Sequence, residues 1–300
     1  MTHERSRPEV ASPRRTHRWS GLLTRFGASG LAASAGALAV VLAVISAACA
    51  PTRLTLPAGP GTPAADVGAA FAEASSACRS AGTIRATIAL SGRAGGQRMR
   101  GTLIAGLAPP DALRLEGVAP FGPPAFILAA HGGSATLLFP RDNRVVTGVS
   151  AADILEALAG VRLDPAALRG ILTGCVVVDP RPDGGRVFTH GWMAIDVGHG
   201  ATAYLLRQQG TWRVVAGLLP GLEVQYQQFE GGRPQTLVIQ SRRDESGSGV
   251  AVDLTLALSD VAVNATLNAS AFDVDLPRDA SPMTLAELRE AGPLGAKAVK

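Results

Sequence analysis

One cysteine stands in a sequence context that predicts covalent chemistry. Cys49 follows the small residues 46–48, at the end of an uncharged and apolar run that begins at Phe26, and an arginine-rich segment precedes that run. Small residues before a cysteine at this place resemble a bacterial lipobox, a pattern in which the thiol receives diacylglycerol and the chain is cut just before it. We therefore predict a lipoprotein signal peptide over residues 1–48 and a lipid anchor at Cys49. An ordinary cleaved signal peptide and a retained membrane-spanning segment are the alternatives.

The two other cysteines, Cys78 and Cys175, lie in the part of the chain that would be exported. An oxidising compartment favours a disulfide between them. Two unpaired cysteines that pack as small hydrophobic side chains are the alternative. Both interpretations stay open at this stage.

No pattern in the exported part predicts catalysis or a metal site. The sequence has no CxxC, HExxH, GxSxG, SxxK or Walker motif. His131, His190 and His199 lie beside turn or strand-end residues, without a neighbouring nucleophile. Asp273 and Asp275 alternate with one valine, which is typical of a solvent-facing strand edge. We expect no enzymatic activity, no metal and no cofactor.

The distribution of charge disfavours nucleic acid as a partner. Residues 1–48 contain six arginines and two glutamates, which accounts for the whole formal net charge of +4. The remainder is neutral overall, so it has no excess of basic side chains to neutralise phosphates. Hydrophobic residues make up 47% of the chain and charged residues 17%, which is typical of a folded protein.

Hydrophobic periodicity divides the rest of the chain into strands and a few helices. Apolar residues recur at helical spacing in 64–81, and strand-like alternation follows from Ile84 to Thr147, starting with a hairpin about a glycine-rich turn. Two short helices are predicted within 151–173, with caps at Ser150 and Asp164. Strands resume from Trp192 to Leu258, and the last predicted elements are a short strand at 271–274 and a helix at 284–290.

The fold class that follows is mainly β with helices (α+β). We predict an antiparallel, half-open β-barrel of about 11 strands, with an N-terminal helix and a helical plug or lid. The predicted domain organisation is a signal peptide over 1–48, a flexible Pro/Gly tether over 49–65, a half-barrel over 66–278, and a C-terminal tail with a short helix over 279–300.

Several phrases of the sequence resemble the LolA/LolB superfamily of lipoprotein carriers. They are Leu90–Arg93, Arg100–Gly106, Leu113–Glu116, Pro120–Gly122 with Phe126, and Leu138–Asp142, followed by the helical pair that ends at Ile171–Gly174. The resemblance covers about residues 65–278. It implies an incomplete antiparallel barrel whose hydrophobic cavity holds acyl chains under covering helices. It also implies a loop that delivers lipoprotein to the membrane, for which Pro120–Pro124 is the candidate.

The predicted function is a cell-envelope lipoprotein, facing the periplasm on the outer membrane, that binds acyl chains of lipids or lipoprotein cargo. Candidate cavity residues are the apolar side chains of the first strands: Met99, Leu103, Leu113, Leu115, Phe126, Leu128, Leu137 and Phe139. These residues could equally form a closed core. The alternative function is a non-enzymatic scaffold or sensor module that binds an envelope protein through the rim or through the loop at 240–249.

Overall fold

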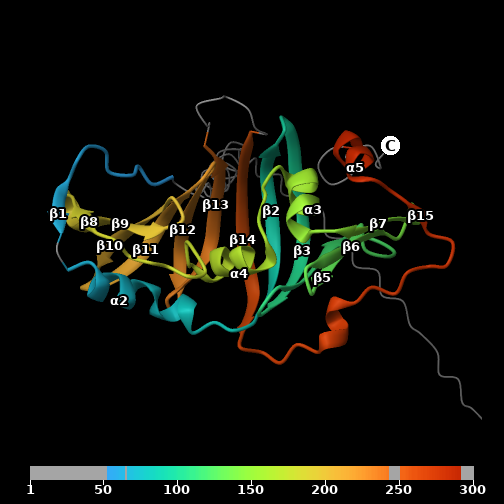
Figure 1. Ribbon diagram of the computed structural model, residues 1–300, viewed down its shortest axis with the longest axis horizontal. Coiled ribbons are helices and arrows are strands. Elements are labelled where there is room, and N and C mark those ends of the chain that lie inside the picture. Colours follow the sequence, from blue (N-terminus) through green and yellow to red (C-terminus); the bar gives the residue numbers. More distant parts are fainter. Residues whose placement is uncertain (1–52, 65, 243–250, 292–300) are drawn as a thin grey trace, which may run out of the picture. The chain divides into compact units, whose positions relative to one another are not determined.

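One sheet of fifteen strands forms the framework of the protein (Figure 1). The computed structural model describes residues 53–64, 66–242 and 251–291. Cys49 and the signal segment lie outside the described residues. The described residues belong to one compact unit, Thr52–Lys300. No helix among them is both long enough and apolar enough to span a bilayer.

The strands, in chain order, are β1 (Thr62–Ala64), β2 (Ile84–Ala94), β3 (Gln97–Ala108), β4 (Ala112–Val118), β5 (Phe126–His131), β6 (Ser134–Phe139), β7 (Arg144–Val149), β8 (Gly185–Val187), β9 (Trp192–Gly198), β10 (Ala201–Gln208), β11 (Thr211–Leu219), β12 (Leu222–Glu230), β13 (Arg233–Ser241), β14 (Val252–Val263) and β15 (Ser281–Pro282). The α-helices are α2 (Gly68–Arg79), α3 (Ala151–Ala159), α4 (Pro165–Thr173) and α5 (Leu285–Ala291). Two short 3-10 helices are η1 (Thr189–Gly191) and η2 (Ala269–Phe272).

The sheet is assembled from two meanders that meet in its centre. Its strand order is β1-β8-β9-β10-β11-β12-β13-β14-β2-β3-β4-β5-β6-β7-β15. Consecutive strands are mostly joined by tight turns, which is why they pair antiparallel. The long strands β14 and β2 pair along their length and join the two meanders. The chain crosses from β7 to β8 through α3 and α4, so this helical pair lies between the two meanders in sequence.

The predicted class, mainly β with helices, is confirmed, whereas the predicted strand number was too low. The sheet does not close into a barrel, because the edge strands β1 and β15 each pair with one neighbour only. The strands that sequence analysis missed, β1, β8 and β15, have only two or three residues. Alternation with period two cannot be recognised over so few positions.

Side chains alternate between the two faces of the sheet. In β2, Ile84, Ala86 and Ile88 are buried, whereas Arg85 and Ala89 are exposed. The buried set faces α2, α3 and α4, which all pack on the same side, here called the inner face (Figure 1). One hydrophobic cluster therefore extends from the strands to the helices. The opposite side is called the outer face.

Both ends of the described chain take part in this unit. Leu54, within the predicted tether, exchanges two hydrogen bonds with the side chain of Gln225 on β12, at 2.8 and 2.9 Å. In the predicted tail, β15 pairs with β7, and Leu288 of α5 is fully buried. The predicted strand at 271–274 is instead the end of η2 followed by irregular backbone. This segment packs near β4 and β5, where Arg114 donates hydrogen bonds to the carbonyl oxygens of Ala271 and Asp273 at 2.9 Å.

Gly92 in β2 is required where β2 and β14 approach closely. Its φ is +138°, and a Cβ atom there would lie 2.1 Å from the backbone oxygen of Asp253. We expect Gly92→Ala to lower the free energy of unfolding by about 2–3 kcal/mol, because the clash is with backbone and the φ value is unfavourable for L-residues. Urea unfolding measures this change. Gly101→Ala in β3 is the control, since no atom lies within 4 Å of its Cβ position; an equal loss in both variants would contradict the argument.

Candidate functional site: the apolar inner face beneath the helical pair

The helical pair α3–α4 is defined by its local sequence. Ser150 caps α3 by accepting a hydrogen bond from the Asp153 N–H at 3.1 Å, and Asp164 caps α4 by accepting one from the Ala167 N–H at 2.7 Å. Gly160 and Gly174 end the two helices with φ values of 71° and 98°. Both caps and the end at Gly174 are as predicted, because they depend on neighbouring residues only.

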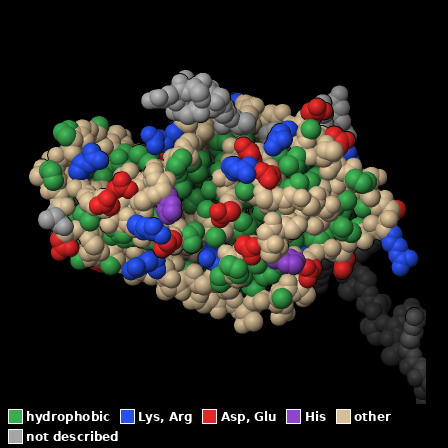
Figure 2. Space-filling model, viewed as in Figure 1, with side chains coloured by type: hydrophobic (Ala, Val, Ile, Leu, Met, Phe, Trp, Pro, Cys, Tyr) green, Lys and Arg blue, Asp and Glu red, His purple; other side chains and the backbone are tan. Residues whose placement is uncertain are grey.

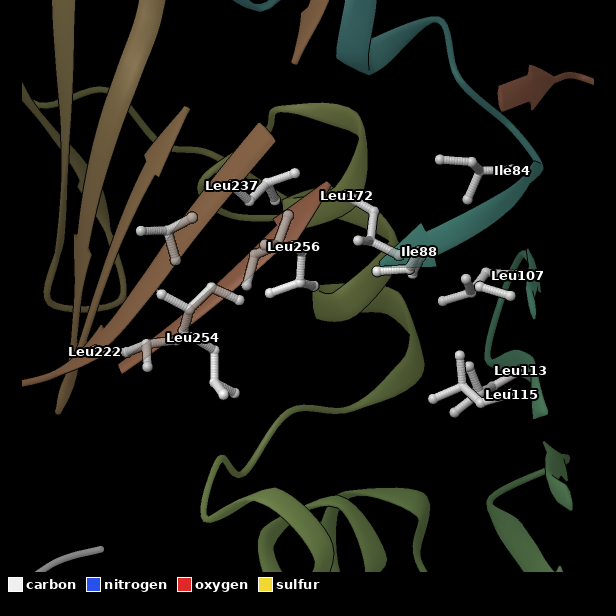
Figure 3. Packing of buried hydrophobic residues seen from close by; sticks show 14 of the residues in the cluster. Ile84, Ile88, Leu107, Leu113, Leu115, Leu172, Leu222, Leu237, Leu254 and Leu256 are labelled. Atoms are coloured by element: carbon white, nitrogen blue, oxygen red, sulfur yellow. The ribbon is translucent and has the colours of Figure 1, made fainter. Parts of the chain in front are cut away.

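The pair covers part of the inner face. Helix α3 packs against β5 and β6, and α4 packs against β3, β4 and β13. Ile154 and Leu158 of α3 and Ile171 and Leu172 of α4 are buried to 2% exposure or less. Figure 3 shows Leu172 among leucine and isoleucine side chains of the sheet. The helices therefore close the core through side-chain packing against the strands.

A disulfide fastens the end of α4. Cys175, just after α4, is bonded to Cys78 at the end of α2, with their Cα atoms 5.5 Å apart. The Tyr226 hydroxyl, on β12, also donates a hydrogen bond to the Cys175 carbonyl oxygen at 3.1 Å. Burial raises the pKa of Tyr226, so this hydroxyl stays a donor at neutral pH. Position 175 is thus held by a covalent bond and by the sheet.

The other end of the pair is held by weaker contacts. Helix α5 packs against α3, and Glu287 of α5 forms an ion pair with Arg144 of β7 at 2.9 Å. In the linker between the helices, Arg162 contacts Asp153 at 2.5 Å and Glu156 at 3.0 Å. The hydrogen bond from Ser150, and then the contact with Arg162, lower the pKa of the Asp153 carboxyl. The first ion pair joins α5 to β7, and the other two join α3 to its own linker, so α3 is fastened less firmly than the disulfide-linked end of the pair.

The predicted cavity residues all lie in or against the hydrophobic cluster. Seven of the eight are buried, and Leu103 is half-buried. Under α4 and in the adjoining strands the packing is closed, since Leu107, Leu113, Leu128 and Leu137 have no exposed surface. Most of these residues thus belong to a tight core.

The inner face is open farther along β3, toward the β2–β3 turn. Gly101 lies on the inner face between Met99 and Leu103, yet it is exposed, and no atom lies within 4 Å of its Cβ position. Its cross-strand neighbour is Leu90, which in turn faces Leu256 of β14. These two leucines are each 7% exposed, in contrast to the fully covered leucines under α4.

We call this place, defined by Leu90, Gly101, Leu103 and Leu256, the apolar recess. Leu222 and Leu254, in the same hydrophobic cluster, are also slightly exposed, at 7% and 4%. In Figure 3, Leu222 and Leu254 lie on one side of the view, and Leu107, Leu113 and Leu115 lie across from them. Figure 2 shows hydrophobic side chains gathered over the central strands of this face. The four residues that define the recess have no titratable side chain, so the surface that they offer suits an apolar ligand.

The polar residues singled out from the sequence are dispersed. His131 and Asp273 lie 2.9 Å apart, both largely exposed. His190 lies in η1 and His199 at the turn between β9 and β10, with positive φ values of 61° and 57°. Among the described residues, no group of three or more histidine, cysteine or acidic side chains is arranged to hold a metal ion. Most of the predicted protein-binding loop, residues 243–249, lies outside the described residues.

The loop between β4 and β5 carries the most exposed large hydrophobic side chain of the described part of the chain. Phe121 is 87% exposed. Arg141 lies in the turn between β6 and β7. Its guanidinium donates a hydrogen bond to the Phe121 carbonyl oxygen and so supports the β4–β5 loop. The side chain that the resemblance points to is thus presented to solvent.

Fold and site together define a class: an open antiparallel sheet with an apolar inner face covered by a fastened helical pair. No protein-family model and no curated protein matches the sequence. Similar solved structures include a LolA superfamily protein from Nitrosomonas europaea, with 12% identity, covering 68% of this chain and 97% of that chain at a TM-score of 0.45.

A DUF1329 family protein from Desulfovibrio piger has 10% identity over 69% of this chain and 97% of its own, with a TM-score of 0.44. The lipoprotein LppX from Mycobacterium tuberculosis has 12% identity over 67% of this chain and 96% of its own, with a TM-score of 0.29. A LolA superfamily protein, from the group that the sequence resembles, is thus one of these neighbours at low identity.

Proposed function

We propose that this protein is a non-enzymatic lipoprotein of the bacterial envelope that binds acyl chains in the apolar recess. Cys49 would carry the lipid anchor, and the folded unit would face the periplasm, on the outer membrane. The cargo would be a lipid or the acylated end of another lipoprotein.

The observation that carries this proposal is the contrast along β3. The same strand passes from fully covered core at Leu107 to open space at Gly101, on the same apolar face. A folded protein ordinarily fills or covers such a position. An acyl chain would cover it, with a gain of about 0.8 kcal/mol for each buried CH₂ group.

The helical pair offers a way to enlarge the recess. Its α4 end is fastened by the disulfide, whereas α3 is held by packing against β5, β6 and α5 and by exposed ion pairs. Movement of α3 and the linker about the fixed end would uncover Leu128, Leu137 and neighbouring side chains of β5 and β6. The predicted cavity residues would then become part of the binding surface.

Native mass spectrometry with organic extraction tests this proposal. We expect the mature chain, purified from a bacterial envelope in mild detergent, to carry about one acyl-bearing molecule per chain besides its own anchor. The mass of the N-terminal peptide reports the lipid on Cys49 separately. A chain free of bound lipid, from several detergents, would contradict the proposal and favour a module that binds a protein partner.

A further inference from the structure

Three arginines gather on the outer face, where β2 turns into β3. Arg93, Arg98 and Arg100 are all exposed, and they alternate with the buried Ala94 and Met99. Arg93 lies directly opposite Arg98 in the register of the two strands, and Arg100 lies opposite Ser91. They therefore form one cluster on the side of the sheet away from the helices.

This cluster is electrostatically unfavourable as it stands. Like charges at directly opposed positions of two strands repel each other. Within the described residues, none of the three guanidinium groups forms a hydrogen bond or ion pair. The neighbouring acid, Asp253 on β14, lies opposite Arg93 but is engaged by Arg53 at 2.6 Å. One shared carboxylate therefore offsets the repulsion only in part, and such a local cost is typical of a functional site.

The surface between these side chains is hollowed. A depression of about 440 Å³ is lined by Ser91, Arg93, Arg98, Arg100, Asp253 and Thr255. Guanidinium groups bind phosphate oxygens with paired, charge-assisted hydrogen bonds. The depression can accept an anionic headgroup.

Chain connectivity indicates which anion meets this face. Arg53 and Leu54 both lie on the outer face, against Asp253 and Gln225. Only three residues separate Arg53 from Cys49. A chain of that length spans at most about 14 Å. If Cys49 is acylated, as the proposed function states, the bilayer surface lies within that distance of Arg53 and hence beside the arginine cluster.

Exposed apolar side chains continue the same face. Ile104 of β3 is 45% exposed and Val118 of β4 is 46% exposed. Ile104 shares the outward parity of Arg98 and Arg100, and Val118 lies opposite Thr102, next to it. Basic side chains beside exposed apolar ones are typical of surfaces that lie on a membrane.

We propose that the outer face at Arg93, Arg98 and Arg100 docks on the anionic phospholipid headgroups of the membrane in which the protein is anchored. This orientation rests on the proposed anchor at Cys49. Gly101 follows Arg100 in β3, so the same hairpin carries the docking surface on one face and the apolar recess on the other.

Arginine labelling in nanodiscs tests the orientation. The mature chain is reconstituted in discs with about one-third phosphatidylglycerol, or with phosphatidylcholine only, and treated with a phenylglyoxal reagent. We expect labelling of Arg98 and Arg100 to be at least fivefold slower in the anionic discs, and 1 M salt to remove the difference because it screens exposed charges. Arg186 and Arg278, exposed elsewhere, are internal controls and should label equally in both discs.

Two matched variants separate docking from lipid binding. Arg93→Gln/Arg98→Gln/Arg100→Gln should abolish the slower amide exchange of the β2–β3 turn in anionic discs, whereas Arg85→Gln/Arg186→Gln/Arg278→Gln should keep it. Both variants should retain bound lipid. A wild-type chain without bound lipid would contradict the proposed function, whereas the docking is judged by the labelling and exchange alone.

Equal labelling of Arg98 and Arg100 in the two kinds of disc would overturn the inference. Protection that is equal in both discs relative to detergent would indicate contact with zwitterionic lipid or protein, and would also overturn it. If the mass shows no lipid on Cys49, the full chain is mixed with vesicles of the same two compositions. Labelling of Arg98 and Arg100 then has to be fivefold slower on the anionic vesicles. Equal labelling on the two kinds of vesicle would refute the proposal.

Discussion

Removing the disulfide by Cys78→Ala/Cys175→Ala is expected to lower the free energy of unfolding by about 4–5 kcal/mol. The bond closes a loop with a sequence separation of 97 residues, and such a loop constrains the unfolded chain strongly. For a unit of this size, the change corresponds to a fall in Tm of about 10 °C or more. Thermal unfolding of the wild-type and variant chains, each with and without reductant, measures it.

Reductant provides the matched control for this prediction. It should lower the Tm of the wild-type chain toward that of the variant and leave the variant unchanged. Hydrogen exchange should also increase first in α4, because the disulfide fastens the residue that follows this helix to α2. A variant with wild-type Tm and unchanged exchange in α4 would show that the bond contributes nothing to holding the helical pair.

Filling the apolar recess is expected to remove the bound lipid while the fold is kept. Gly101→Trp places an indole ring where no atom lies within 4 Å of the Cβ position. The ring would cover Leu90 and compete for the surface that an acyl chain needs. We expect the lipid found by native mass spectrometry to fall at least tenfold, and the free energy of unfolding to change by less than about 1 kcal/mol.

The adjacent residue offers the control. Thr102→Trp introduces the same ring one position along β3, where the side chain points to the outer face. This variant should retain its lipid, and Gly101→Ala should retain most of it. A polar substitution, Leu103→Gln, should also reduce the amount of bound lipid, as Gly101→Trp does. Equal lipid content in Gly101→Trp and Thr102→Trp would exclude the recess as the binding surface.

Elements controlled by neighbouring residues could be predicted from the sequence. The helical pair was predicted over 151–173, and α3 and α4 occupy Ala151–Ala159 and Pro165–Thr173. Capping by Ser150 and Asp164 is a contact over three residues, so the sequence contains all that it needs. Long strands such as β2 and β3 were predictable for the same reason, because alternation is a local pattern.

The candidate site could be predicted only in part. The apolar residues of β3 to β6 were identified, but the sequence left open whether they form core or cavity. The structure divides them: Leu113 and Leu137 are fully covered, whereas Leu103 borders the recess. The exposure of Gly101 was not foreseen, because a glycine in an alternating strand does not report what lies opposite it.

The sequence by itself determined the antiparallel, mainly β class, the place of the helical pair and the prediction of an anchor at Cys49. Each depends on composition or on residues close together in the chain. Only the tertiary structure decided that the sheet stays open, that Cys78 meets Cys175 next to Tyr226, and that Arg53 lies beside Arg93. These contacts join residues far apart in sequence, and their formation depends on how the whole sheet packs, which no local pattern records.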